Sequence, residues 1–133
     1  ELSRSILSEL DYKKEADNMI RFKREYENND LTVPQLIPKL LSNRTIGMSF
    51  VEGMPIRHFL SKVPSSSESV LKTLVSSFLV QIFIRGFFHA DPHPGNFFIT
   101  SRGKIALLDF GAIGRREGSS DVETSEGAII ERC

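Results

Sequence analysis

The chain has 133 residues, enough for about one domain of ordinary size. Lys plus Arg and Asp plus Glu each number 17, so the formal charge is zero and no overall positive field favours nucleic acid as a partner. The single cysteine, Cys133, excludes an internal disulfide framework and a cysteine-based zinc site. Because the first residue is Glu rather than Met, we expect the chain to be a piece of a longer protein.

A long helix is expected over residues 2–28, because apolar residues recur there at helical spacing without Gly or Pro. Asp11 and Glu15 lie four residues apart, so they share one face of this helix and repel each other. Two interpretations stay open. Either Lys13 and Lys14 neutralise a solvated face, or Glu15 awaits a cation from outside this segment, such as a phosphate-binding Lys.

The next two segments, residues 35–41 and 45–53, are expected to form a hairpin whose first strand is irregular because it contains proline. The second segment alternates with period two, so three apolar side chains should share a face: Ile46, Met48 and Phe50. A short helical connection is expected over residues 55–61.

A second long helix should follow, because Ser65 with Glu68 three positions later fits a capping box. Its inward stripe is predicted to contain Val70, Leu71, Leu74, Phe78 and Ile82, and Gly86 should end it. The most apolar stretch, residues 74–90, carries Ser, Gln and Arg. It is too short and too polar for a bilayer span, so we expect a buried core helix and no transmembrane segment.

The residues that carry chemistry lie between Gly86 and Gly111. Residues 97–100 and 104–108 predict two short strands joined by a tight turn, with Asn96 just before the first strand and Asp109 just after the second. An antiparallel hairpin brings these two ends together, with Asp91 on the adjoining loop. Carboxylate and amide oxygens suit Mg²⁺, which prefers oxygen ligands together with substrate phosphates.

The spacing of these residues also matches the requirements of phosphoryl transfer. His89, Asp91 and Asn96 fit the pattern H-x-D-x-x-x-x-N, and residues 109–111 read Asp-Phe-Gly. In that chemistry the first Asp orients the acceptor or takes its proton, while the Asn and the second Asp hold metal. Each motif is common by chance, but the two in this order, joined by a hairpin, are specific.

Two other interpretations of this region are weaker. Asp91 and Asn96 could merely cap a proline-rich loop, with Asp109 beginning a turn. Alternatively, His89, Asp91 and His93 could be the metal ligands of a hydrolase, but that interpretation leaves Asn96 and the Asp-Phe-Gly motif unexplained.

Four stretches resemble the UbiB family, the AarF-domain-containing kinases (ADCK), which are atypical and kinase-like: ELDYKKEADNMIRF, SFVEGMPI, GFFHADPHPGNFF and IALLDFGAIG. The resemblance covers about residues 1–116. Aminoglycoside and choline phosphotransferases are the runner-up, since their catalytic loop can read H-x-D-x-H-P-G-N. They usually carry an IDWE-like metal segment and lack the ELDYxxEA helix.

The resemblance assigns a role to each matching position. Glu9 and Asp11 look like the family's ExD pair, thought to engage an N-terminal extension, and Glu15 looks like the helix glutamate that pairs with the ATP-binding Lys. Glu52, Gly53 and Met54 look like the hinge that meets adenine. Asp91 looks like the catalytic aspartate, and Asn96 and Asp109 look like the metal ligands.

The resemblance implies an α+β, protein-kinase-like fold that is partial here. Residues 1–51 would belong to the small lobe, residues 52–116 to the hinge and large lobe, and residues 117–133 to a divergent polar tail. The KxGQ extension, an Ala-rich phosphate loop and the ATP-binding Lys should precede Glu1 in a longer protein. We therefore expect this segment by itself neither to bind ATP tightly nor to turn it over.

The family resemblance also implies partners, cofactors and a location. It implies an ATPase or kinase using ATP and Mg²⁺, supporting coenzyme Q and prenyl-lipid biosynthesis, with a lipid precursor or lipid-biosynthesis proteins as further partners. Members are membrane-associated in mitochondria, plastids or bacteria. A non-catalytic nucleotide-binding scaffold on the same fold is the main alternative.

Overall fold

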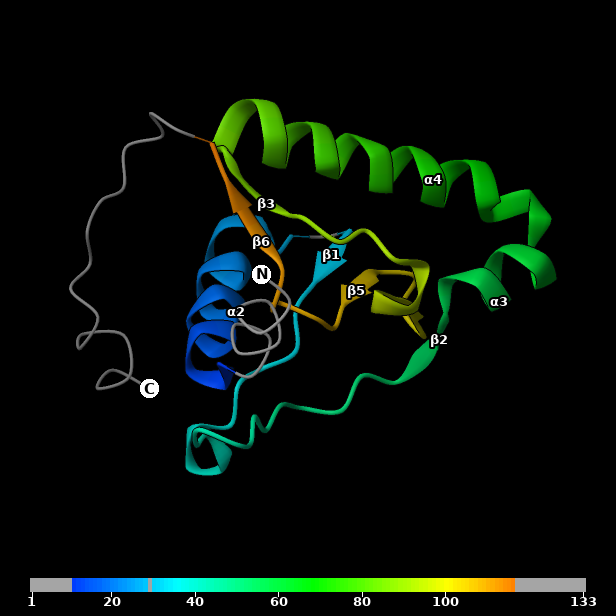
Figure 1. Cartoon of the computed structure of the whole chain (residues 1–133). Coiled ribbons are helices and arrows are strands. Elements are labelled where there is room, and N and C mark those ends of the chain that lie inside the picture. Colours follow the sequence, from blue (N-terminus) through cyan, green and yellow to red (C-terminus); the bar gives the residue numbers. More distant parts are fainter. Residues whose placement is uncertain (1–10, 29, 117–133) are drawn as a thin grey trace.

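The computed structural model describes residues 11–28 and 30–116, and a four-stranded sheet lies at its centre (Figure 1). The strands of this sheet, in spatial order, are β1 (Leu31–Thr32), β5 (Ile105–Leu107), β4 (Phe97–Thr100) and β2 (Gly53–Pro55). A second, two-stranded sheet pairs β3 (Phe87–His89) with β6 (Ile113–Arg115). Helices and strands therefore mix in an α+β fold, as the sequence predicts.

The hairpin predicted from residues 97–108 is present. β4 and β5 are antiparallel, with Phe97 opposite Leu107 and Ile99 opposite Ile105. The turn between them contains Gly103 at φ 78°, a left-handed conformation that glycine adopts without a steric penalty. β2 pairs antiparallel with β4, and β1 pairs parallel with β5, so the hairpin forms the middle of the sheet.

Helix α2 (Tyr12–Tyr26) supplies much of the core. Asp11 caps it, accepting a 3.1 Å hydrogen bond from the Lys14 backbone N–H. One face of the helix is buried, and it contains Ala16, Asn18, Met19, Phe22 and Tyr26. The aromatic members of this face pack against Phe87 and Phe110. The predicted helix over residues 2–28 is thus confirmed over α2, while its first part lies outside the described residues.

Glu27 fastens the end of α2 to the segment that follows. Its Oε1 accepts hydrogen bonds from Lys23 Nζ at 2.8 Å and Thr32 Oγ1 at 3.0 Å, and from the Val33 backbone N–H at 3.3 Å. Burial would raise the pKa of Glu27, but these hydrogen bonds outweigh burial and hold the pKa below its usual value.

Replacing Glu27 by Gln should lower the free energy of unfolding by about 1 kcal/mol near neutral pH. Because the pKa is lower in the folded than in the unfolded protein, this stabilisation is fully present above the ordinary value of 4.5. It disappears as the pH falls through the folded-state pKa. Urea unfolding of both proteins at neutral and acidic pH measures it.

Glu68→Gln is the control for this prediction. Glu68 forms the same type of i,i+4 pair with Lys72, but both side chains are at least three-quarters exposed. We expect its loss to change stability by at most about 0.5 kcal/mol. An equal effect of the two substitutions, or an effect of Glu27→Gln that persists in acid, would contradict the prediction.

The hairpin predicted from residues 35–53 forms only in part. Two isolated antiparallel bridges, Leu36 with Met48 and Ser42 with Thr45, connect its arms, and neither arm is a continuous strand. Pro38 begins a 3₁₀ turn, Pro38–Leu40, that interrupts the first arm. Phe50 is 93 % exposed rather than facing inward with Ile46 and Met48, so the predicted alternation is wrong at this position.

The short connection predicted over residues 55–61 is confirmed as α3 (Ile56–Lys62). The helix α4 (Pro64–Leu79) follows directly and continues as a π-helical segment, Val80–Arg85. The predicted capping box is wrong, because Val63 precedes the helix without a side-chain cap and Pro64 takes the first helical position. Gly86 ends the helix at φ 66°, as expected.

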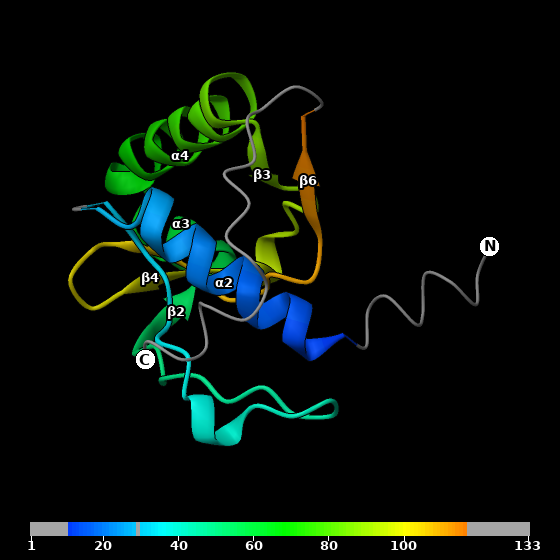
Figure 2. The same cartoon turned by 90° about the vertical axis from the view of Figure 1, so that its left-hand side faces the viewer.

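The burial of α4 differs from the prediction. Val70, Leu74 and Phe78 pack against the core, but a second face is exposed and contains Leu71, Val75, Leu79, Val80, Phe83 and Ile84. The helix runs along one side of the sheet (Figures 1 and 2). The expected buried core helix is therefore only partly buried in the described residues, and Leu71, one of the five residues of the predicted inward stripe, lies on the exposed face.

The same helix bears on the expectation that the chain contains no bilayer-spanning segment. Pro64–Arg85 has 22 residues and is long and apolar enough to cross a membrane by length and composition, and only 6 % of its apolar 18-residue window is buried. Core helices of soluble proteins pass the same test of length and composition, so this single helix is weak evidence for a membrane span.

Candidate functional site

The predicted site residues Asp91, Asn96 and Asp109 lie around the hairpin of β4 and β5. Asn96 ends a 3₁₀ turn (Pro94–Asn96) just before β4, and its carbonyl accepts a 3.0 Å hydrogen bond from the Leu108 N–H. Asp109 follows Leu108 directly, so the backbones of Asn96 and Asp109 meet at one edge of the sheet. The placement expected from the sequence is thus observed, while the role of these residues as metal ligands stays a prediction.

His89 connects the loop of Asp91 to Asp109. Its Nε2 lies 2.8 Å from the Asp109 carbonyl oxygen, and its Nδ1 accepts a 3.1 Å hydrogen bond from the Asp91 backbone N–H. With Nδ1 accepting, the proton must sit on Nε2, which donates to Asp109. Burial lowers the pKa of His89, which favours the neutral ring that this arrangement requires. The histidine therefore orients both motifs.

Further hydrogen bonds hold the loop that contains Asp91. The Asn96 side-chain Nδ2 lies 3.4 Å from the Asp91 carbonyl oxygen, and the Ala90 N–H donates to the Ala112 carbonyl at 2.8 Å. The side chain of Asp91 is exposed, and those of Asn96 and Asp109 are half-buried. The loop is thus fixed through its backbone, which leaves side-chain oxygens accessible to a ligand.

The geometry does not support the hydrolase interpretation. Both ring nitrogens of His89 are occupied by backbone partners, and His93 Nδ1 accepts a 3.1 Å hydrogen bond from the Gly95 N–H. Among residues 11–28 and 30–116 there is no group of three or more His, Cys, Asp or Glu side chains that could hold a metal ion. His89, Asp91 and His93 therefore do not form a ligand cluster.

Glu15 on α2 faces the Asp-Phe-Gly segment. Burial raises the pKa of its carboxyl, and the negative charge of Asp109 raises it further, while a hydrogen bond from the Phe110 backbone opposes the rise. A nearby cation would stabilise this carboxylate, as the second interpretation of its role requires. Asp11 caps the helix one turn earlier, and Glu9 lies outside the described residues.

The predicted hinge residues lie elsewhere on the sheet. Gly53 lies opposite Thr100, the last residue of β4, whereas Asn96 directly precedes the first residue of this strand. Four residues of extended chain correspond to about 13 Å. A Cβ at Gly53 would lie 2.3 Å from the Ile99 carbonyl oxygen, so only glycine allows this pairing. Glu52, exposed, accepts a 3.3 Å backbone hydrogen bond from Ser101, and Met54 is half-buried. The structure thus brings Glu15, Asp91, Asn96 and Asp109 together, and keeps the hinge residues apart from them.

Two residues at the site carried no sequence prediction. Asn18, buried on α2, donates a 2.9 Å hydrogen bond from Nδ2 to the Phe110 carbonyl. Gln81, buried on the segment after α4, accepts a 3.1 Å hydrogen bond from the His89 backbone N–H. The sequence signal for both residues is a polar amide within an apolar helical stripe. Because a buried amide needs a hydrogen-bond partner, such a residue indicates a contact with another element.

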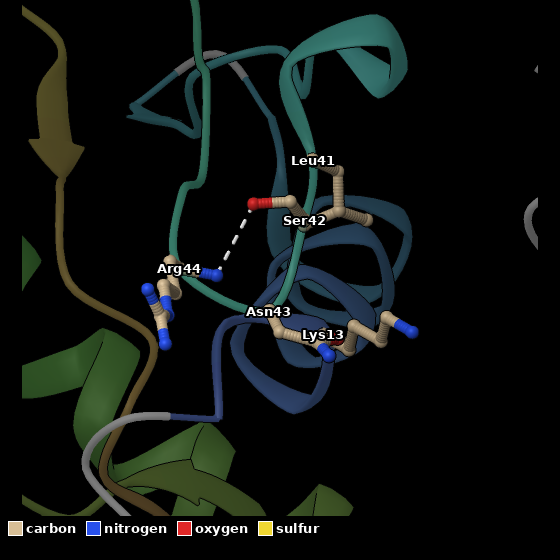
Figure 3. A pocket seen from close by; sticks show the side chains of 5 residues that line it. All are labelled: Lys13, Leu41, Ser42, Asn43 and Arg44. Carbon is tan, nitrogen blue, oxygen red and sulfur yellow. Dashed lines mark hydrogen bonds between the residues drawn. The ribbon is translucent and has the colours of Figure 1, made fainter.

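Two hollows lie away from these site residues. One, of about 460 Å³, is lined by Lys13 and the turn Leu41, Ser42, Asn43 and Arg44, and the other, of about 530 Å³, lies between α2 and α4. Figure 3 shows the hydrogen bond that the Arg44 backbone N–H donates to Ser42 Oγ. The Lys13 and Arg44 side chains lie on opposite sides of the turn. The two cations therefore do not converge on one ligand position.

Comparison with known proteins gives one family. The sequence model of the ABC1 atypical kinase-like domain matches residues 1–125. An Arabidopsis thaliana protein named ACTIVITY OF BC1 COMPLEX KINASE 3, chloroplastic, is 39 % identical over 129 residues, covering 94 % of this chain and 17 % of the relative. An Arabidopsis aarF domain-containing protein kinase, also named chloroplastic, is 34 % identical over 115 residues, covering 86 % of this chain and 16 % of the relative.

Solved structures show a related fold. The structure of Rv3197 with erythromycin, from Mycobacterium tuberculosis, matches with a TM-score of 0.69 at 26 % identity, over 84 % of this chain and 29 % of that one. The bifunctional kinase-methyltransferase WbdD matches with a TM-score of 0.52 at 23 % identity, over 87 % and 25 %, which indicates the fold only. The chain spans about a sixth of the length of the two Arabidopsis relatives described in the preceding paragraph.

Proposed function

Because the chain belongs to the ABC1 atypical kinase-like family, as its UbiB-like motifs predict, we propose that it carries part of the Mg²⁺–ATP site of a phosphoryl-transferring enzyme or ATPase. The observation that supports this most directly is that His89 hydrogen-bonds to the backbones of both Asp91 and Asp109, while Asn96 hydrogen-bonds to Asp91 and to Leu108, the residue before Asp109. Asp91, Asn96 and Asp109 are the three positions that phosphoryl transfer requires in this order.

The donor atoms at the site fit magnesium. Asn96 uses its Nδ2 toward the Asp91 carbonyl, which leaves its Oδ1 as an acceptor, and Asp109 accepts from the Gly111 N–H through Oδ1, which leaves Oδ2. Both remaining atoms are oxygens, the ligands that Mg²⁺ prefers. We propose that Asn96 and Asp109 hold the metal, which when bound would neutralise the charge on phosphate oxygens.

The other residues of the site have roles that follow from their positions. Asp91 is exposed and fixed through its backbone, so its carboxylate could orient an acceptor hydroxyl or water and take its proton. Glu15 is placed to meet a cation beside Asp109, such as a phosphate-binding Lys. We propose that the hinge residues Glu52, Gly53 and Met54 meet adenine farther along the sheet.

The wider biological role is also a proposal. Several Arabidopsis relatives are named chloroplastic, which supports a plastid or other organellar location. Family resemblance supports a role in coenzyme Q or prenyl-lipid biosynthesis at a membrane, with lipid precursors or lipid-biosynthesis proteins as partners.

Calorimetric titration of the full-length protein with ATP tests the proposed function. We expect binding in the presence of Mg²⁺ and a large loss of affinity when the metal is removed with EDTA, because the phosphates would then face the carboxylates without a counter-charge. Metal-independent binding, or no nucleotide binding, would overturn the proposal. Magnesium-dependent binding without any turnover would favour the non-catalytic scaffold.

A further inference from the structure

Asn18 is a polar residue in a place that favours apolar ones. It is 4 % exposed and shares the buried face of α2 with Ala16, Met19 and Phe22. Asn is a poor helix former, and burying its amide is unfavourable unless each polar atom finds a partner. The position therefore needs a reason beyond the formation of the helix.

The partner of Asn18 lies 92 residues away, inside the Asp-Phe-Gly motif. Its Nδ2 donates a 2.9 Å hydrogen bond to the Phe110 carbonyl oxygen. The Phe110 ring is fully buried and packs edge-on against Phe22, the residue one turn after Asn18, with ring centroids 5.6 Å apart. Helix α2 thus holds both the backbone and the side chain of Phe110.

The hydrogen bond from Asn18 acts on Asp109 through a single peptide group. The Phe110 carbonyl and the Gly111 N–H belong to the same planar trans unit, so they point in opposite directions. While Asn18 holds the carbonyl, the Gly111 N–H is turned toward Asp109, where it donates a 2.9 Å hydrogen bond to Oδ1. The orientation of the Asp109 carboxylate is therefore coupled to Asn18.

The opposite side of Asp109 is held independently. Its own carbonyl oxygen lies 2.8 Å from His89 Nε2, so the backbone before Phe110 is fixed by one side chain and the backbone after it by another. With both flanking peptide groups anchored, the carboxylate has little freedom to turn. Loss of either anchor would release it.

On this geometry we propose that Asn18 is a positioning residue for Asp109: its hydrogen bond to Phe110 orients the peptide group that holds the Asp109 carboxylate toward the metal. The part of this proposal that refers to a metal rests on the proposed function. It assigns to α2 a second tie to the site besides Glu15, one turn earlier on the same helix.

Asn18→Leu in the full-length protein tests this role, because leucine has nearly the shape of asparagine and no donor. The matched control is Tyr26→Phe, which removes another buried hydrogen bond from α2 to a backbone carbonyl, that of Phe87, away from the site. The first readout is the Mg²⁺ concentration that gives half-maximal binding of a non-hydrolysable ATP analogue. We expect it to rise about tenfold or more in Asn18→Leu, and to be unchanged in Tyr26→Phe.

Hydrogen exchange without nucleotide gives a second, independent readout. The amides of Phe110 and Gly111 should exchange several-fold faster in Asn18→Leu, but not in Tyr26→Phe. If the leucine variant does not fold, Asn18→Ala, which needs less space, replaces it in both measurements.

The outcomes separate the two proposals. Equal Mg²⁺ dependence and equal exchange in Asn18→Leu and the unsubstituted protein would overturn the positioning role and leave the proposed function standing. Failure of the unsubstituted protein to bind the Mg²⁺–nucleotide would overturn the proposed function and the reference to a metal. The exchange measurement would then still decide whether Asn18 orients this turn.

Discussion

Replacement of Asp109 by Asn is expected to reduce Mg²⁺-dependent nucleotide binding by at least about a hundredfold in the full-length protein. The substitution keeps the shape of the side chain and its acceptor for the Gly111 N–H, but removes the negative charge at the proposed metal position. Substitution of a residue that only holds a metal ligand in place commonly reduces metal affinity by about 10–100-fold. Loss of a charged ligand itself should reduce the affinity at least as much. Titration with Mg²⁺ at fixed nucleotide concentration measures the change.

Two matched substitutions show whether the effect is specific. Asp91→Asn should keep Mg²⁺-dependent binding and lower only turnover, because Asp91 is assigned to the acceptor rather than to the metal. Asp30→Asn removes an exposed carboxylate at the start of β1 and should change neither. Normal metal dependence in Asp109→Asn would remove the basis for a nucleotide site at this edge of the sheet.

Truncation of Phe87 to Ala is expected to lower the free energy of unfolding by about 3–5 kcal/mol. The ring is fully buried and stacks on Tyr26 at 6.5 Å between centroids, while the Arg21 guanidinium lies 4.1 Å above it. Its removal would leave a cavity where α2 meets β3, and the surrounding rings can fill that space only partly. Urea unfolding of the full-length protein measures the loss.

Phe50→Ala is the control for the loss of a phenyl ring at an exposed position. It removes the same ring from a position that is 93 % exposed, so we expect a change within about 0.5 kcal/mol. A large effect at Phe50 would mean that this surface is covered in the full-length protein. A small effect at Phe87 would contradict the core described above.

The elements predicted correctly are those whose signals are local. Gly86 adopts the left-handed conformation that ends a helix, and the short strands on either side of residues 101–103 pair across a tight turn. From that hairpin the meeting of Asn96 and Asp109 followed directly, because antiparallel pairing fixes which residues lie opposite each other. The candidate site was therefore largely predictable from spacing.

One error is local: Ser65 and Glu68 fit a capping pattern, but Pro64 starts the helix and Val63 is its N-cap, two residues before Ser65. The other errors arose where the outcome depends on distant partners. Leu71 fits the helical stripe of α4, yet it is 44 % exposed, and Phe50 fits a strand alternation, yet its neighbours form no continuous strand. Periodicity identifies an apolar face, but only the packing of other elements decides whether that face is covered.

The sequence by itself determined the order of the chemical groups and the hairpin that joins two of them, because turn residues and strand alternation act over a few positions. Only the tertiary structure decided that His89 bridges the two motifs and that Asn18 reaches Phe110 across 92 residues. Such contacts depend on how helix and sheet pack, and a buried amide or imidazole shows its partner only when that packing is known.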